Sequence, residues 1–481
     1  MTNSRNSTPL FEGIDLGSVI LYVVLTIIGC LAIFSAKYVS DDPEPFAFSH
    51  EYIKQIVWVG ISWVLGFIIL LIKFSFWHKY AYHGYVLALL LILMTFVIGK
   101  QINGAKAWLS MGPLRIQPME IMKIMMGLTI AKIMSAFNFS IERPADLARV
   151  GILILIPVLL AVLQNDTGSG LVLFSLLFML YREGLNNWIC IPLIFIAVLF
   201  LFSFLLTQTT LMLCLLVVLY FSAAKMNRIW KKAIQGFAMT ILLSILIFLP
   251  GMLFGITYYQ SLLIACVISI FFILYFAYKS NLRNLYILSA IFFFSIMMIH
   301  SSNALLDRMF VHQKERIVSF LGLKSDPRAD YNVIQSKIAI GSGGFGGKGY
   351  LQGTQTRYGF VPERHTDFIF CGIGEEFGFC GAVVVLVLLF WLIYRMLKMA
   401  DKQRDIFGRV YCSCVASILL FHTVINVGMT IGLVPVMGIP LPFISYGGSS
   451  IMTMTILVFI AFNMDASTRL SISADNKKLM L

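Results

Sequence analysis

The feature that most constrains this chain is a series of long apolar runs that recur from one end of the sequence to the other. A helix needs about 20 mostly apolar residues to cross a membrane. The sequence predicts fourteen spans: Leu16–Ala36, Gln55–Ile72, Tyr80–Gly99, Pro118–Phe137, Val150–Leu163, Leu171–Tyr181, Trp188–Leu206, Leu211–Ala224, Phe237–Leu249, Ser261–Tyr278, Leu285–Ile299, Phe368–Tyr394, Val410–Leu433 and Phe443–Phe462. Because the runs are continuous rather than alternating, they exclude a strand barrel and predict an all-α polytopic membrane helix bundle.

The composition supports this class. Hydrophobic residues make up 59% of the 481 residues and charged residues only 12%, against about 25% charged in soluble domains. This excludes an ordinary soluble domain, a disordered chain and a nucleic-acid-binding protein. The eight cysteines include no CxxC pair, so we expect neither a disulfide framework nor a zinc site. The first run is as long as a true span, and we expect it to remain as an uncleaved helix.

Lys and Arg concentrate in alternate connections between the runs, for example at Lys231 and Lys402. Cytoplasmic loops carry such an excess, which predicts that both termini lie in the cytoplasm. The opposite, extracytoplasmic face then carries the four polar loops: Lys100–Gln117, Gln164–Gly170, Ser301–Thr366 and Val434–Pro442. A long loop in a compact protein is usually functional, so we expect a site on this face.

Ionisable residues at membrane depth mark functional sites by default. Glu120 and Lys123 lie three residues apart in the fourth span, where they share a helix face and partly neutralise each other. The pair can serve a site or only fix helix packing. Asp166 lies at the outer end of the fifth span.

The densest polar cluster is the stretch 362–367, Pro-Glu-Arg-His-Thr-Asp, which leads directly into the apolar run from Phe368. Thr366 or Asp367 can cap that helix, so Asp367 is either a helix cap or a functional carboxylate. Glu375 and Glu376 follow two turns deeper, and at least one of them needs a partner or a proton. We expect the partner charge to come from Lys337 or Arg364.

The glycine-rich run 341–349 resembles a phosphate-binding loop. The pattern GxxxxGK[ST] fails twice, at Ser342 and at Gly349. We therefore predict a tight turn in which backbones pass closely. Backbone N–H groups that cradle a lipid-linked pyrophosphate stay open as an alternative.

Four motifs carry a resemblance to a known family. They are Gly104-Ala105-Lys106-x-Trp108; Arg115-x-Gln117-Pro118-x-Glu120-x-x-Lys123; the stretch from Gln335 to Gly344 that leads to Pro362-Glu363-x-His365-Thr366-Asp367-Phe368; and Pro440-x-Pro442-x-Ile444-Ser445-Tyr446-Gly447-Gly448-Ser449-Ser450. With these motifs the sequence resembles the SEDS family (shape, elongation, division and sporulation). The segment Lys348-Gly349 with Gly353-Thr354-Gln355 makes it more similar to the RodA branch than to the FtsW branch.

The resemblance implies a peptidoglycan glycosyltransferase that polymerises lipid II into glycan strands at the outer face of the bacterial cytoplasmic (inner) membrane, for cell-wall elongation and rod shape. It implies that Asp367 is the essential carboxylate, and as the general base it would suit an inverting reaction. Positive charge is needed at the departing pyrophosphate. The candidate substrate- and pyrophosphate-binding residues are Arg115, Lys123, Lys106, Trp108, Gln117, Glu120, Arg364, Ser445 and Ser449.

The resemblance also implies partners: the lipid-linked nascent glycan, a class B penicillin-binding protein that acts as transpeptidase, and other membrane proteins of the elongation complex. No cofactor is certain, and a divalent cation, Mg²⁺ or Mn²⁺, stays open. The family has ten spans, so the fourteen predicted here divide into the core half 1–206, an insert 207–300, a large extracytoplasmic loop 301–366 and the C-terminal spans 367–481. Two functions stay open beside the first, a lipid II flippase or transporter and an FtsW-like division polymerase. A scaffold that only activates its transpeptidase is a further class.

Overall fold

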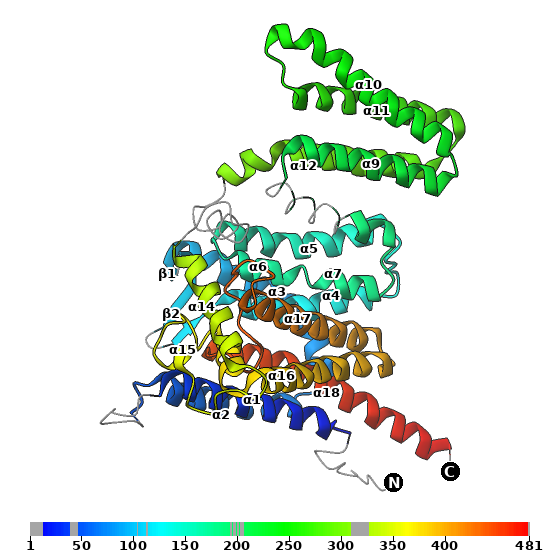
Figure 1. Cartoon of the computed structure of the whole chain (residues 1–481). Coiled ribbons are helices and arrows are strands. Elements are labelled where there is room, and N and C mark those ends of the chain that lie inside the picture. The colour runs from blue at the N-terminus through cyan, green and yellow to red at the C-terminus, as the bar shows by residue number, and fades with distance from the viewer. Residues whose placement is uncertain are drawn as a thin grey trace. The chain divides into compact units, whose positions relative to one another are not determined.

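The computed structural model describes residues 13–38, 47–102, 104–111, 114–192, 206–308 and 327–479, with single positions at 195, 199 and 202. The chain divides into two compact units, one formed by Met1–Leu185 with Ser325–Leu481 and the other by Asn186–Lys324. Figure 1 shows the helices of each unit lying side by side. The second unit contains the predicted insert 207–300 and extends beyond it at both ends.

The first unit is a helical bundle whose elements alternate with short connections. Its helices are α1 (Leu16–Lys37), α2 (Glu51–Leu71), α3 (Phe74–Ile98), α4 (Pro118–Met134), α5 (Pro144–Leu163), α6 (Thr167–Leu173), α7 (Leu176–Arg182), α14 (Pro327–Gly343), α15 (Thr354–Arg357), α16 (Ile369–Lys402), α17 (Ile406–Thr430) and α18 (Gly448–Leu479). Helix α17 lies at the centre, where it packs against α4, α7, α16 and α18. This central position is why most of its apolar window is buried inside the protein.

The second unit is an antiparallel arrangement of α9 (Gln208–Asn227), α10 (Trp230–Gly251), α11 (Tyr258–Ser280) and α12 (Arg283–Arg308), with a short 3-10 turn at Met252–Phe254. Helix α9 packs against α10 and α12, and α11 packs against α10 and α12. Leu216, Cys266 and Phe292 lie in their shared apolar core. The side chains of Thr257 and Gln260 form a capping box that starts α11.

A small antiparallel sheet follows α3. Its strands are β1 (Lys100–Ile102), β2 (Ala105–Met111) and β3 (Leu114–Ile116), in the order β1-β2-β3. Trp108 pairs with Lys100, and Ser110 pairs with Arg115. The sequence predicted only a loop over Lys100–Gln117, because β1 and β3 have three residues each and the seven-residue β2 stands alone between them.

The predicted fold class is confirmed: the protein is a polytopic helical membrane protein. Eleven helices among the described residues are long and apolar enough to cross a membrane. The predicted spans at Pro118–Phe137 and Leu171–Tyr181 correspond to the shorter helix α4 and to the broken pair α6 and α7. The predicted span Trp188–Leu206 lies largely outside the described residues.

Two predicted boundaries move. The last span begins at Gly448 rather than at Phe443, because the residues before it form an irregular segment. The predicted loop 301–366 contains regular structure: α12 continues to Arg308, and both α14 and α15 lie within it. In Figure 1, α14 and α15 lie beside the beginning of α16.

Candidate functional site

Asp367 lies immediately before the long helix α16. The N-cap of this helix is Phe368, and no side chain caps it by a hydrogen bond. The Thr366 hydroxyl instead donates to Glu363 Oε2 at 3.0 Å. Neither predicted cap residue therefore caps the helix. Asp367 is half-buried, and its Oδ2 atom lies against Gly438, where an added Cβ would be 3.5 Å away.

The irregular segment before α18 holds the backbone around Asp367. Asn426, on α17, donates its side-chain N–H groups to the carbonyl oxygens of Asp367 at 2.8 Å and of Ile439 at 2.7 Å. Ser445 Oγ donates to the Thr366 carbonyl at 2.7 Å, and it accepts a bond from the Leu441 N–H. These bonds fix the position of Asp367 through backbone atoms of two loops.

His365 contacts the same segment at Tyr446. Its carbonyl accepts a bond from the Tyr446 N–H at 2.9 Å. Its ring lies 5.5 Å from the Tyr446 ring, and Nε2 is 3.3 Å from Glu51 Oε2. Burial lowers the pKa of His365, and the charge of Glu51 opposes this only in part. At neutral pH His365 is therefore a neutral neighbour of Asp367 rather than a cation.

A buried charge network joins α4 to α17. Lys123 Nζ lies 2.7 Å from Glu120 Oε1 and 3.2 Å from His422 Nε2. His422 Nδ1 lies 3.1 Å from the Pro440 carbonyl. A carbonyl only accepts, so Nδ1 carries the hydrogen and Nε2 accepts from Lys123. The lysine is only 1% exposed. Its charge therefore acts on the site through its electric field rather than by direct contact.

Gln117 connects two further segments next to this network. Its side-chain N–H groups donate to Asp166 Oδ2 at 2.6 Å and to Ser169 Oγ at 3.0 Å. Asp166 also caps α6 by accepting from the Ser169 N–H. Burial raises the pKa of Asp166 against the lowering effect of these bonds. The predicted residue Gln117 is therefore a cross-link between the start of α4 and the α5–α6 connection.

The remaining predicted residues are Arg115, Trp108, Ser449, Lys106 and Arg364, and they lie on several different elements. Arg115 is exposed on β3, close enough to Tyr446 for its charge to oppose the rise in pKa that burial gives that phenol. Trp108 is half-buried on β2, and Ser449 is half-buried in the first turn of α18. Lys106 is exposed and donates to the Phe96 carbonyl. Arg364 donates to the Ala36 carbonyl at the end of α1.

The structure thus brings several predicted residues around one segment. Residues 438–446 include Ser445, contact Asp367 at Gly438 and bond to the Thr366 carbonyl. They meet the Glu120–Lys123 pair through His422, and the charge of Arg115 acts on Tyr446. The contacts of Lys106 and Arg364 lie on other elements.

The glycine-rich run packs closely against α16, as predicted. The N–H groups of Gly347, Lys348 and Gly349 donate to the carbonyls of Gly343, Glu375 and Glu376. Gly347 has a φ of 82°, and a Cβ there would collide with the Glu376 carbonyl oxygen. These three N–H groups are occupied, so they do not form the pyrophosphate cradle that the sequence left open.

The predicted partners of Glu375 and Glu376 are wrong. Glu375 pairs with Lys348 at 2.6 Å, not with Lys337 or Arg364. Glu376 accepts a bond from Ser35 on α1. The partner of Glu375 belongs to the glycine-rich run, and only the folded backbone brings that run to α16.

Sequence reasoning missed His422 and Asn426, which hold the segment 438–446. A signal for them existed, because both are polar residues inside the apolar run Val410–Leu433 and lie four residues apart on one helix face. Within the described part of the chain, no group of three or more His, Cys, Asp or Glu residues is arranged to hold a metal ion.

Fold and site together define a polytopic helical membrane protein in which residues 362–367 and 438–446 meet at one half-buried aspartate. The model of the FtsW, RodA and SpoVE family, described as cell cycle proteins, matches residues 17–213 and 210–470. The chain belongs to this family, as the resemblance predicted.

Curated relatives match over nearly their whole length. The peptidoglycan glycosyltransferase RodA of Treponema pallidum is 31% identical over 471 residues, with 92% of this chain and 95% of the relative covered. The peptidoglycan glycosyltransferase MrdB of Escherichia coli is 28% identical over 460 residues, with 94% of each covered. A probable peptidoglycan glycosyltransferase FtsW of Trichlorobacter lovleyi is 25% identical, with 95% and 94% covered.

Solved structures share the fold. A chain from a structure of a peptidoglycan synthase complex superposes with a TM-score of 0.60 at 23% identity, covering 95% of this chain and 98% of that one. The rod shape determining protein RodA of Thermus thermophilus gives a TM-score of 0.55 at 22% identity, covering 96% and 99%.

Proposed function

We propose that the chain is a peptidoglycan glycosyltransferase of the RodA kind, which polymerises lipid II into glycan strands for cell-wall elongation. The names of the curated relatives, matched over nearly their full length, support the activity. The higher identity to the RodA relative than to the FtsW relative favours elongation over division. The observation that carries the proposal is the position of Asp367. The side chains of Asn426 and Ser445 hold the carbonyls of Asp367 and Thr366, while α16 starts without a side-chain cap.

The proposed reaction is a displacement at an anomeric carbon. The 4-hydroxyl oxygen of lipid II attacks the anomeric carbon of the lipid-linked glycan, and the bond from that carbon to the pyrophosphate oxygen breaks. The pyrophosphate leaves with the electron pair, and Asp367 takes the hydroxyl proton as general base. An α-linked donor gives a β-linked product by one inversion, so no covalent glycosyl-enzyme is required.

Positive charge would stabilise the departing pyrophosphate. Arg115 is the best placed candidate, because it is exposed beside the segment that contacts Asp367. Lys123 would act through its field rather than by contact, since its ammonium is enclosed by Glu120 and His422. Lys106, Arg364, Trp108 and Ser449 are proposed as further contacts for the lipid-linked substrates. Gln117, Glu120 and Ser445 would keep the surrounding loops in place.

A divalent cation is compatible with this site only with help from the substrate. Mg²⁺ and Mn²⁺ are commonly held by one or two carboxylates plus phosphate oxygens. Asp367 is the residue that would hold such an ion, and the ion would supply positive charge at the leaving pyrophosphate. The protein residues described above would still bind, orient and deprotonate the substrates.

We further propose the orientation and the partners. The excess of Lys and Arg in alternate loops supports cytoplasmic termini and an extracytoplasmic site. A fold shared with a chain of a peptidoglycan synthase complex supports a complex with a class B penicillin-binding protein. Other elongation-complex membrane proteins are proposed as further partners on the same ground.

Purified protein incubated with lipid II tests the activity. Polymerised glycan is the expected product, and the Asp367→Asn variant should form none at a comparable rate. A flippase or transporter would move lipid II across a vesicle membrane without making polymer. A scaffold would form the complex but make no polymer, alone or with its transpeptidase partner, because the transpeptidase only crosslinks strands. Absence of glycan from folded wild-type protein, alone and with its transpeptidase partner, would contradict the proposal.

A further inference from the structure

A second carboxylate near the site, Glu375, is not used by the proposed chemistry. Its side chain is fully buried on α16. Its Oε1 atom accepts from Lys348 Nζ at 2.6 Å, from the Gln355 N–H at 2.8 Å and from the Thr354 hydroxyl at 3.2 Å. Its Oε2 atom accepts from the N–H and the hydroxyl of Thr356 at 2.9 and 2.8 Å. Both oxygens are therefore engaged by α15 and the glycine-rich run.

The backbone around Glu375 is joined to the same segments. The Glu375 carbonyl accepts from the Lys348 N–H at 3.1 Å, and the Phe379 N–H donates to the Gly344 carbonyl at 2.9 Å. Between these contacts Gly378 has a φ of 63°, which breaks the regular course of α16. The Glu375 side chain and the break at Gly378 therefore both hold the glycine-rich run against α16.

The segment after this run leads directly to Asp367. The Phe360 N–H bonds back to the Gln355 carbonyl, and Val361 is fully buried against Phe368 and Cys371. The six residues 362–367 follow at once. Their starting point is thus set by α15, which Glu375 holds, and their end is set by the first turn of α16.

We propose that Glu375 is a positioning residue for the reaction of Asp367. Its bonds to Lys348, Gln355 and Thr356 hold α15 on α16, and this fixes where the segment with His365 and Asp367 begins. This inference rests on the proposed function, because it assigns the fixed segment a role in that reaction. A misplacement of about 1 Å far from the reacting atoms can lower a rate by about a hundredfold.

The test compares four variants of the full-length protein in lipid II polymerisation. Glu375→Gln keeps the shape but loses charge and acceptor capacity, and Thr356→Val removes one hydroxyl bond. Thr356→Ser retains that bond. Gln355→Ala is the matched control, because Gln355 contributes its backbone N–H and not its side chain.

We expect Glu375→Gln to lower kcat by about 10- to 100-fold while KM for lipid II changes little. Thr356→Val should lower kcat by less, and Thr356→Ser and Gln355→Ala should match the wild type. Amide hydrogen exchange should rise at 354–361 in Glu375→Gln and stay unchanged in α17. If Glu375→Gln does not fold, the Thr356→Val and Thr356→Ser pair decides the question by the same two readouts.

Unchanged kcat with unchanged exchange at 354–361 would overturn the proposal. Faster exchange in both 354–361 and α17 would also overturn the proposal, because it would indicate a general loss of stability. Failure of the proposed function is distinguishable from either result. In that case the wild type makes no glycan, and the exchange comparison still decides whether Glu375 holds the segment.

Discussion

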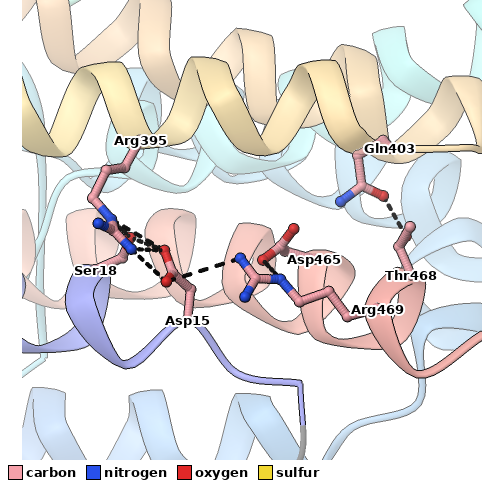
Figure 2. A network of polar contacts seen from close by, with 7 residues as sticks. All are labelled: Asp15, Ser18, Arg395, Gln403, Asp465, Thr468 and Arg469. Carbon is pink, nitrogen blue, oxygen red and sulfur yellow. Dashed lines mark hydrogen bonds and ion pairs between the residues drawn. The ribbon is translucent and has the colours of Figure 1, made fainter. Parts of the chain in front are cut away.

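Two polar regions lie at opposite ends of the first unit and are built differently. One is the site end, formed by Asp367, Asn426, Ser445, His422 and the Glu120–Lys123 pair. The other is the Asp15 cluster, formed by Asp15, Ser18, Arg395, Asp465 and Arg469 (Figure 2). Helix α16 reaches both, and Glu375 and Arg395 are separated by 20 residues of it, or about 30 Å.

In the Asp15 cluster, charged side chains meet each other directly. Arg395 Nε donates to Asp15 Oδ2 at 3.1 Å and to Ser18 Oγ at 2.7 Å. Figure 2 shows Asp15 between Arg395 and Arg469, and the latter pairs with Asp465 at 2.8 Å. Beside them Thr468 donates to Gln403 at 2.6 Å. These pairs join α1, α16 and α18.

At the site end, most of the bonds around Asp367 end on backbone carbonyls. Asn426, Ser445 and the Tyr446 N–H hold the carbonyls of Asp367, Thr366 and His365. The comparison teaches that the Asp15 cluster is fastened by side-chain charges, while the loop around Asp367 is held by its backbone so that a carboxylate can be presented, next to the separate buried Glu120–Lys123 pair. Substitutions of Asp15 and of Asp367 should therefore separate stability from activity.

The largest expected effect on stability comes from the buried pair at the site end. Lys123→Met leaves Glu120 as an uncompensated buried charge, which should lower the free energy of unfolding by about 3–5 kcal/mol. Denaturant unfolding of the purified protein measures this. The double variant Glu120→Leu with Lys123→Met should recover much of the loss, and equal losses in the single and double variants would contradict a structural pair.

Asp15→Asn should have the next largest effect. It weakens charge-assisted bonds from Arg395 that are each worth about 1.5–3 kcal/mol. We expect a lower melting temperature and a normal rate of glycan synthesis for the folded protein. A normal melting temperature with reduced synthesis would reverse the roles assigned to the two ends.

The pH dependence of stability gives a second test of the Asp15 cluster. Burial alone would raise the pKa of Asp15, but bonds from Arg395 and Ser18 and the charges of Arg395 and Arg469 outweigh it and hold this pKa below its ordinary value. A depressed pKa gives stability that is present above the unfolded value of about 3.9 and is lost as the pH falls through the folded pKa. The difference in melting temperature between wild type and Asp15→Asn should therefore shrink below about pH 4, and a difference that grows there would show the opposite sign.

The smallest effect is expected at Arg149, which pairs with Asp146 near the start of α5. The side chain of this arginine is 72% exposed, so Arg149→Ala should change the free energy of unfolding by about 0–1 kcal/mol. Thermal unfolding of Arg149→Ala, compared with that of Asp15→Asn, measures this. A loss as large as that of Asp15→Asn would show that exposure does not separate the two pairs.

The sequence predicted what hydropathy controls. The long apolar runs became the helices, and the Glu120–Lys123 pair formed because both residues lie on one turn of α4. The glycine-rich run packs tightly because its glycines can approach a backbone closely. These features depend on local spacing, which a sequence displays directly.

Features that depend on long-range contacts were not predictable in the same way. Lys348 meets Glu375 only because α16 breaks at Gly378 and the glycine-rich run fits beside it. The strands β1 and β3 are too short for a pattern, and β2 pairs with them only in the fold. His422 and Asn426 were visible as polar residues in an apolar run, but the carbonyls of Pro440 and Asp367 that they bind could not be assigned without the fold.

The most direct test of the account measures Asp367→Asn and Asp15→Asn side by side, for lipid II polymerisation and for thermal unfolding. We predict that Asp367→Asn unfolds like the wild type and loses polymerisation by about 10²–10⁴-fold, the usual value of general acid–base catalysis. We predict that Asp15→Asn unfolds at a lower temperature and polymerises normally while folded. Glycan synthesis at a near-normal rate by well-folded Asp367→Asn would contradict the claim that the site end carries the chemistry through this carboxylate.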